Sequence, residues 1–232
     1  MRKLYLVPII HTSSDMGSLA LAISERGAAA LGKEVWRRHQ ETVSGFWDSI
    51  AQFFNSLEVD GFKIYQDGLV ADGKDGLQIV DEGMRRGSAN YALISSLLQS
   101  GAVLITTEDI SLVKREHGYI TELIRAKSLL ERETAALRYK LAQRKLLEER
   151  DDFIAKKIDM TLQEGDTGVL FIGAYHDVSS RLPADILVVE IKEATRVKEY
   201  HTLLTAISAR KQSQRLQQLA EYLVSPIPDV LS

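Results

Sequence analysis

Two histidines each follow an apolar run of the sequence, and each has a carboxylate close behind it. The run LYLVPII ends at His11 with Asp15 nearby, and the run GVLFIGA leads to His176 with Asp177 next to it. Near neutral pH an imidazole acts as a base or as a metal ligand, and an aspartate orients it or binds a hard cation. The alternative is that each histidine only caps a loop through backbone hydrogen bonds.

A charged segment, Glu149-Arg150-Asp151, precedes the second of these runs. If the segment is helical, Arg150 lies one turn before Ile154, on a face next to the one that packs on the sheet. A buried arginine holds a carboxylate or a phosphate through two parallel hydrogen bonds. Arg150 is therefore a candidate anion-binding residue, and an ordinary solvated helix face is the alternative.

One more pair of carboxylates follows an apolar run. Glu108 and Asp109 come directly after the segment AVLITT. Ligands of parallel α/β sheets bind beyond the carboxyl ends of the strands, so Glu108 is an accessory candidate for the same site. For Asp109 the sequence favours a different role, the N-cap of the helix that follows.

The elements that position these residues alternate between strand and helix. Continuous apolar runs predict strands, and apolar residues at spacings of three and four predict helices. The predicted strands are 4–10, 62–65, 102–106, 168–174 and 186–191, and the main helical segments are 28–57, 77–84, 89–99, 120–163 and 193–223. This order predicts one α/β domain over residues 1–232, with a largely parallel central sheet of about five strands flanked by helices.

A helical excursion over about 119–163 is the unusual element, because it contains no Pro or Gly after Gly118. A continuous helix of that length would span roughly 65 Å, whereas a compact domain of this size has a radius of gyration of about 17 Å. The helix must protrude, break into a hairpin or pack on a partner chain. Apolar residues at 123, 130, 137 and 141 form a short heptad pattern, which favours either a solvated amphipathic helix or a homodimer contact.

Composition narrows the classes of function. The 232-residue chain has 29 Lys and Arg, 32 Asp and Glu, five His and no Cys, for a net charge of −3. Without Cys there is no disulfide, no Cys nucleophile and no Cys-ligated metal, so His, Asp or Glu must hold any ion. The slight negative charge argues against a nucleic-acid partner. No apolar run is long enough to cross a membrane, and we expect a cytoplasmic protein.

These pieces together resemble one superfamily, which includes the TraB/GumN proteins, the Tiki metalloproteases, the ChaN haem-binding lipoproteins and the erythromycin-esterase-like proteins. Its members have an early strand that ends in Gly-x-x-His, and later a helix with Glu-Arg-Asn or Arg-Asp before a strand that ends in a second Gly-x-x-His. Glu149-Arg150-Asp151 is similar to the helix motif, and Gly173-Ala-Tyr-His176 is similar to the second histidine motif. His11 stands in the place of the first histidine, with Pro8 in the place of the glycine.

Many members also place a glutamate at the end of the second strand, as a metal ligand or catalytic carboxylate. In this chain the region reads Ile-Tyr-Gln66-Asp67, so Gln66 is the literal match and Asp67 the nearest carboxylate. The resemblance implies a site in which His11, Asp67 and His176 hold a divalent metal ion or activate water. It also implies that Arg150 stabilises an oxyanion or a substrate carboxylate.

Known activities of the superfamily include metal-dependent peptide cleavage, lactone hydrolysis and haem binding. We therefore expect a hydrolase-like protein that acts on a small-molecule or peptide ligand, with His11, Arg150 and His176 as catalytic residues. Four accessory carboxylates accompany them: Asp15, Glu108, Asp151 and Asp177. The alternative is a non-catalytic ligand-binding or regulatory module on the same scaffold, which acts as a homodimer through its long helix.

Overall fold

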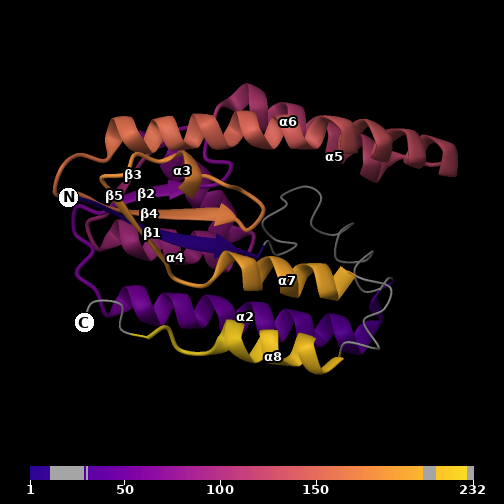
Figure 1. Ribbon diagram of the computed structural model, residues 1–232, viewed down its shortest axis with the longest axis horizontal. Helices are drawn as coiled ribbons and strands as arrows, with labels where there is room; N and C mark the ends of the chain where they lie inside the picture. Colours follow the sequence, from indigo (N-terminus) through magenta and orange to yellow (C-terminus); the bar gives the residue numbers. More distant parts are fainter. Residues whose placement is uncertain (11–28, 30, 206–212, 229–232) are drawn as a thin grey trace.

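Five parallel strands form a single central sheet in the computed structural model, which describes residues 1–10, 29, 31–205 and 213–228. The strand order is β3-β2-β4-β1-β5. The sheet, with helices on both faces, confirms the predicted α/β fold (Figure 1). The strands are β1 Arg2–Ile9, β2 Lys63–Gln66, β3 Val103–Leu104, β4 Thr167–Gly173 and β5 Ile186–Glu190.

Strand β1 lies between β4 and β5 and contains a proline, which has no N–H to give to a neighbouring strand. The carbonyl of Leu6 faces β5, because it accepts a hydrogen bond of 2.9 Å from the amide of Ile191. Backbone groups two residues apart point to the same side, so the nitrogen of Pro8 also faces β5. Strand β5 pairs with β1 only as far as Leu6. The hydrogen bond that Pro8 cannot donate would therefore lie beyond the end of β5, so no pairing between the two strands is lost.

Two layers of helices cover the sheet. One face carries α6, whose Ile154 and Ile158 pack with Leu170 and Ile172 of β4. The other face carries α2, α4, α7 and α8, which form the larger of the two cores with part of α3. The bounds of these helices are α2 Lys33–Asn55, α3 Gly73–Arg85, α4 Ala89–Gln99, α7 Ala194–Thr205 and α8 Ser213–Val224, and a short 3-10 helix, η2 Ser179–Arg181, precedes β5.

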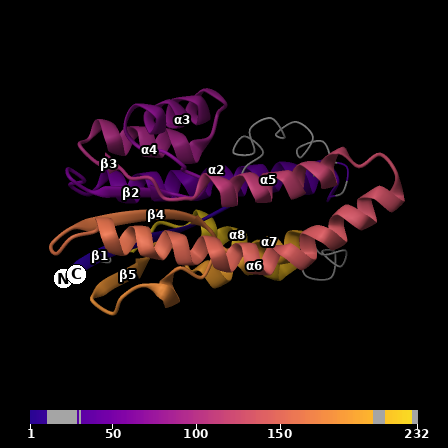
Figure 2. The same ribbon diagram turned by 90° about the horizontal axis from the view of Figure 1, so that it is seen from above.

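The helical excursion is a hairpin of two helices, α5 Ile110–Arg125 and α6 Leu129–Thr161. The break has a local cause in the sequence. Ser128 caps α6 by accepting a hydrogen bond from the amide of Glu131, and the carboxylate of Glu131 accepts one from the amide of Ser128. This reciprocal capping box fixes the start of a helix. The two helices lie side by side and their shared tip extends beyond the sheet (Figures 1 and 2).

The prediction of one helix over 193–223 is wrong, because α7 and α8 lie next to each other. An ion pair of 2.6 Å joins Arg215 of α8 to Glu199 of α7. Sixteen residues of one continuous helix would separate these side chains by about 24 Å. Within the described part of the chain, no helix has the length and apolar character needed to span a membrane.

Candidate active site

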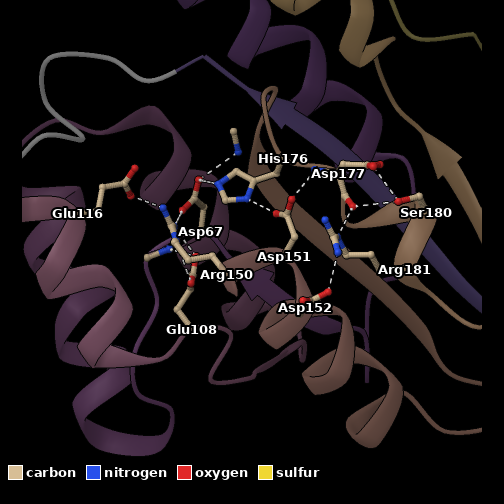
Figure 3. A network of polar contacts seen from close by, with 12 residues as sticks. Asp67, Glu108, Glu116, Arg150, Asp151, Asp152, His176, Asp177, Ser180 and Arg181 are labelled. Carbon is tan, nitrogen blue, oxygen red and sulfur yellow. Dashed lines mark hydrogen bonds and ion pairs between the residues drawn. The ribbon is translucent and has the colours of Figure 1, made fainter. Parts of the chain in front are cut away.

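A cluster of buried charged side chains lies at the carboxyl ends of β2, β3 and β4, beneath the α5–α6 hairpin (Figure 3). Asp67 follows β2, Glu108 follows β3 and His176 follows β4. Arg150 and Asp151 enter from α6, and their side chains are only 6 % and 2 % exposed. Ionisable residues are rarely buried unless they are paired, so this cluster is a candidate functional site.

Arg150 donates hydrogen bonds to three carboxylates of its own chain. Its Nε lies 3.1 Å from Oε2 of Glu108, and one terminal nitrogen lies 2.5 Å from Oδ1 of Asp67. Further short contacts join the guanidinium to Glu108 and to Glu116 of α5. The protein's own carboxylates thus take the place of the anion that Arg150 is expected to hold, which gives the guanidinium a positioning role between β2, β3 and α5.

His176 is held between two aspartates. Its Nδ1 is 2.5 Å from Oδ1 of Asp151, and its Nε2 is 3.6 Å from Oδ2 of Asp67. Both aspartates are fixed in turn by backbone amides, since Asp151 accepts from the amide of Asp177 at 2.9 Å and Asp67 accepts from that of Gly173 at 3.1 Å. An ionised carboxylate can only accept, so the neutral imidazole carries its proton on Nδ1 and its electron pair on Nε2.

Burial and neighbouring charges shift two pKa values in this cluster. Burial raises the pKa of Glu108 to about 7, and the charge of Asp67 adds to that rise while Arg150 opposes it. Burial alone would lower the pKa of His176, but the hydrogen bond to Asp151 and the charge of Asp67 outweigh it, so that the pKa is raised. Glu108 therefore exchanges its proton close to neutral pH, and His176 keeps its proton to a higher pH than a free imidazole does.

The cluster has an excess of negative charge. The carboxylates of Asp67, Glu108 and Glu116 surround Arg150, and that of Asp151 faces His176. Carboxylates outnumber the guanidinium and the imidazole even when His176 is protonated. A cation would therefore be attracted to this position and an anion repelled.

The atoms Nε2 of His176 and Oδ2 of Asp67 fit two ligands of one divalent ion. They are 3.6 Å apart, close to the roughly 3.4 Å between two ligands of a tetrahedral zinc ion at about 2.1 Å. Asp151 on the other ring nitrogen matches the outer carboxylate that orients metal-binding histidines. Among the described residues, no group of three or more His, Asp or Glu side chains is arranged to hold a metal ion.

Of the residues predicted from the sequence, the structure brings together Asp67, Glu108, Arg150, Asp151 and His176. The side chain of Asp177 turns away and accepts a hydrogen bond of 2.8 Å from Ser180. His11 and Asp15 lie outside the described residues. The prediction for Asp109 is confirmed, because its carboxylate caps α5 through the amides of Ser111 and Leu112.

The ambiguity between Gln66 and Asp67 is resolved by the two faces of the sheet. The side-chain carbonyl of Gln66 accepts a hydrogen bond of 2.9 Å from Asn90 of α4, on the face opposite α6. Successive side chains of a strand point to opposite faces. Asp67, just after the strand, therefore turns toward Arg150 and His176, while Gln66 belongs to the core on the opposite face.

Glu116 is the member of the cluster that sequence reasoning missed. Gly118, two residues later, is a residue type that often ends a helix, whereas Glu116 and Gly118 both lie in the middle of α5. Glu116 faces α6, contacts Arg150 and accepts a hydrogen bond of 3.2 Å from Tyr139. The signal that could have found it is the cap at Asp109, since Glu116 lies about two turns after it.

Compared with known proteins, the chain matches no family model, no curated protein and no solved structure.

Proposed function

We propose that this protein is a hydrolase whose acid–base centre is His176, held between Asp151 and Asp67 at the carboxyl ends of the sheet. The observation that carries the proposal is this buried Asp–His–Asp arrangement, in which Nδ1 is fixed by Asp151 at 2.5 Å and Nε2 faces Asp67 at 3.6 Å. Resemblance to the TraB/GumN and Tiki superfamily supports the same function, since its members use a histidine at this strand end.

The proposed chemistry starts from the neutral imidazole of His176. Its Nε2 takes a proton from a water molecule that attacks a substrate carbonyl, and the imidazolium is stabilised by Asp151 and Asp67. The proton then passes from Nε2 to the leaving group. Because the pKa of His176 is raised, hydrolysis should increase as the pH rises through that pKa and the base form accumulates.

Arg150 and Glu108 support this centre without taking part in proton transfer to the substrate. Arg150 holds Asp67 through Oδ1, which leaves Oδ2 of the same carboxylate near His176. Glu108 keeps the guanidinium in place through two hydrogen bonds. With a pKa of about 7, Glu108 also adjusts the charge of the cluster as the pH changes.

A divalent ion is the cofactor that this centre would accept, at Nε2 of His176 and Oδ2 of Asp67, and such an ion would replace His176 as the group that activates water. When bound, such an ion lowers the pKa of a coordinated water and so supplies hydroxide at neutral pH. The ion and a proton compete for Nε2, so metal uptake should release a proton and weaken in acid. Asp151 would then keep the ring in the tautomer that binds metal.

The test uses the purified protein, a panel of peptides, lactones and carboxylic esters, and added Zn²⁺ or Mn²⁺. We expect turnover of at least one class by the wild type and loss of turnover, with loss of bound metal if any is present, in His176→Gln. The matched control is His117→Gln, since His117 is an exposed histidine of α5 outside the cluster. Equal turnover in both variants would refute the assignment of His176.

One observation favours a second candidate function, that of a non-catalytic binding or regulatory module. Every carboxylate around Arg150 except Glu116 is less than a tenth exposed, so the cluster is closed to a large substrate. A module of this kind takes up a cation and changes the stability of the protein without turnover. Stoichiometric metal binding that depends on His176, in a protein inactive on the whole panel, would favour this function over the first.

A further inference from the structure

One end of α6 extends beyond the sheet (Figure 1), and this part of the helix carries an exposed apolar stripe. Leu130, Leu137 and Leu141 are 74 %, 58 % and 74 % exposed, and Thr134 between them is also exposed. At 3.6 residues per turn these four side chains fall within an arc of about 60° around the helix. A contiguous exposed stripe of leucines is typical of a surface that another protein covers.

The hairpin itself does not use this stripe. Ala135 and Leu146 are buried on the opposite side of α6, and Tyr139 on that side stacks on Tyr119 of α5, with ring centroids 6.0 Å apart. The stripe ends after Leu141, where Arg144 and Glu148 form an exposed ion pair of 3.0 Å along the same face. The apolar surface is therefore limited to the outer part of the helix.

The spacing along the stripe is that of a coiled-coil seam. Leu130, Thr134, Leu137 and Leu141 follow each other at intervals of four, three and four residues. This is the d–a–d–a pattern of two helices that pack with side chains of one between those of the other. The natural occupant of such a seam is another helix with the same short pattern.

We propose that α6 of a second copy of this chain packs antiparallel on this stripe, across a twofold axis between Thr134 and Leu137. In that register Leu130 faces the partner's Leu141, and Thr134 faces the partner's Leu137. Glu133, on one flank of the stripe, faces the partner's Lys140. The twofold axis repeats each of these contacts, so that both carboxylates meet ammonium groups.

The other flank of the stripe is complementary in the same register. Glu131 and Arg138 lie there, both exposed. Within the chain, Glu131 caps α6 and Arg138 lies 3.9 Å from Glu122 of α5, and in the dimer each also faces the other residue type on the partner. The flanking residues in the first half of the seam, Glu131 and Glu133, are thus acidic. Those in the second half, Arg138 and Lys140, are basic. An antiparallel pair places the acidic half of one helix opposite the basic half of the other. The charges of flanking residues set the orientation of coiled coils in this way.

A parallel pair of the same helices would be less favourable. It would keep Glu133 opposite the partner's Arg138, but it would place Lys140 opposite the partner's Lys145. It would also bring both sheet domains to the same end of the pair, whereas the antiparallel arrangement leaves them at opposite ends of the paired tips. The seam is about 17 Å long, so the dimer is small and dissociates readily on dilution.

The test measures the oligomeric state of the intact chain by sedimentation velocity over a wide range of concentration. We expect a reversible dimer whose dissociation constant rises by at least about tenfold in E133K and in K140E, because each single change puts like charges together at both ends of the seam. The double variant E133K/K140E should recover the dimer. A mixture of the two single variants should also form a mixed dimer, since their flanks are complementary.

Several outcomes would overturn the proposal. A wild-type chain that stays monomeric at every concentration would do so, as would a dimer that Leu137→Glu and the charge changes leave intact. If neither the double variant nor the mixture of single variants recovers the dimer, the antiparallel register is excluded. A monomer that instead binds phosphatidylcholine–phosphatidylserine vesicles, and loses that binding in Leu137→Glu, would assign the stripe to a lipid surface.

Discussion

Arg150 and His176 share one carboxylate, that of Asp67, and this sharing sets the electrostatics of the cluster. One oxygen of Asp67 contacts the guanidinium, and the other lies near the imidazole. A change in the charge of Arg150 or His176 therefore changes the electrostatic environment of the other group through Asp67 and Glu108. Buried networks of this kind respond strongly to the loss of a single member, because the remaining charges lose their compensation.

The first prediction concerns stability and pH. The folded-state pKa values of Glu108 and His176 are both raised, so the folded protein holds more protons than the unfolded chain from about pH 5 to above pH 7. The free energy of unfolding should fall as the pH rises through this window, with Glu108 contributing on the order of 3 kcal/mol. Urea denaturation at several pH values measures the slope.

Glu108→Gln should make this slope shallower, because the variant no longer binds a proton at residue 108 on folding, which leaves the contribution of His176. Glu148→Gln is the matched control, since Glu148 is an exposed carboxylate of α6. A slope of the same size in wild type and Glu108→Gln would show that Glu108 titrates normally in the folded protein.

The second prediction concerns Arg150. Replacing it with Leu removes the guanidinium that three carboxylates share and should cost about 3–5 kcal/mol of unfolding free energy. Arg144→Leu, at an arginine that is 89 % exposed on the same helix, should change the stability little. Denaturant unfolding at neutral pH compares the two variants. Equal stabilities would mean that the carboxylates are neutral or solvated without Arg150.

Much of the residue-scale picture follows from the sequence, because the strand-end rule by itself selects Glu108 and His176. The side-chain direction of Gln66 could not be predicted, since it depends on which strand residue is the last one paired. The cap at Asp109 places Glu116 about two turns into α5, but the direction of its side chain could not be predicted for a similar reason. Its contact with Arg150 requires the rotation of α5 about its own axis, which is set by packing against α6.

At the scale of elements, the spacing of apolar residues does not reveal the break between α5 and α6. The apolar pattern runs on through residues 126–128, where the chain leaves α5 and enters α6. The local signal is the Ser128-x-x-Glu131 capping box, which competes with a continuous pattern of helix-forming residues. The last predicted helix fails likewise, as its two halves pack on each other through contacts that no local pattern encodes.

The third prediction belongs to this scale and concerns the start of α5. Asp109→Ala removes the side-chain cap and should cost about 1 kcal/mol. Asp72→Ala is the matched control, because Asp72 stands at the N-cap of α3 without a side-chain cap hydrogen bond. Thermal unfolding followed by circular dichroism compares them. If both variants lose the same stability, the bond from Asp109 contributes nothing specific.

At the scale of the whole molecule, the sheet brings distant parts of the chain to one edge. Strand order β3-β2-β4-β1-β5 places β2 next to β4, so that Asp67 and His176 meet although about 110 residues separate them. The sequence indicates parallel strands and hence a shared edge, but it does not determine their order. The non-consecutive order is decided by how α6 on one face and α2 and α4 on the other bury their apolar surfaces.

The central claim is that His176 works as the base of a hydrolase because Asp151 orients it, and turnover by Asp151→Asn tests this most directly. The matched control is Asp152→Asn, at the adjacent aspartate, which is 67 % exposed and pairs with Arg181. We predict that, on the best substrate of the panel, kcat falls by about 10²–10⁴ in Asp151→Asn and stays near the wild-type value in Asp152→Asn. Equal kcat in all three folded proteins, or no turnover by the wild type on any substrate, would contradict this claim.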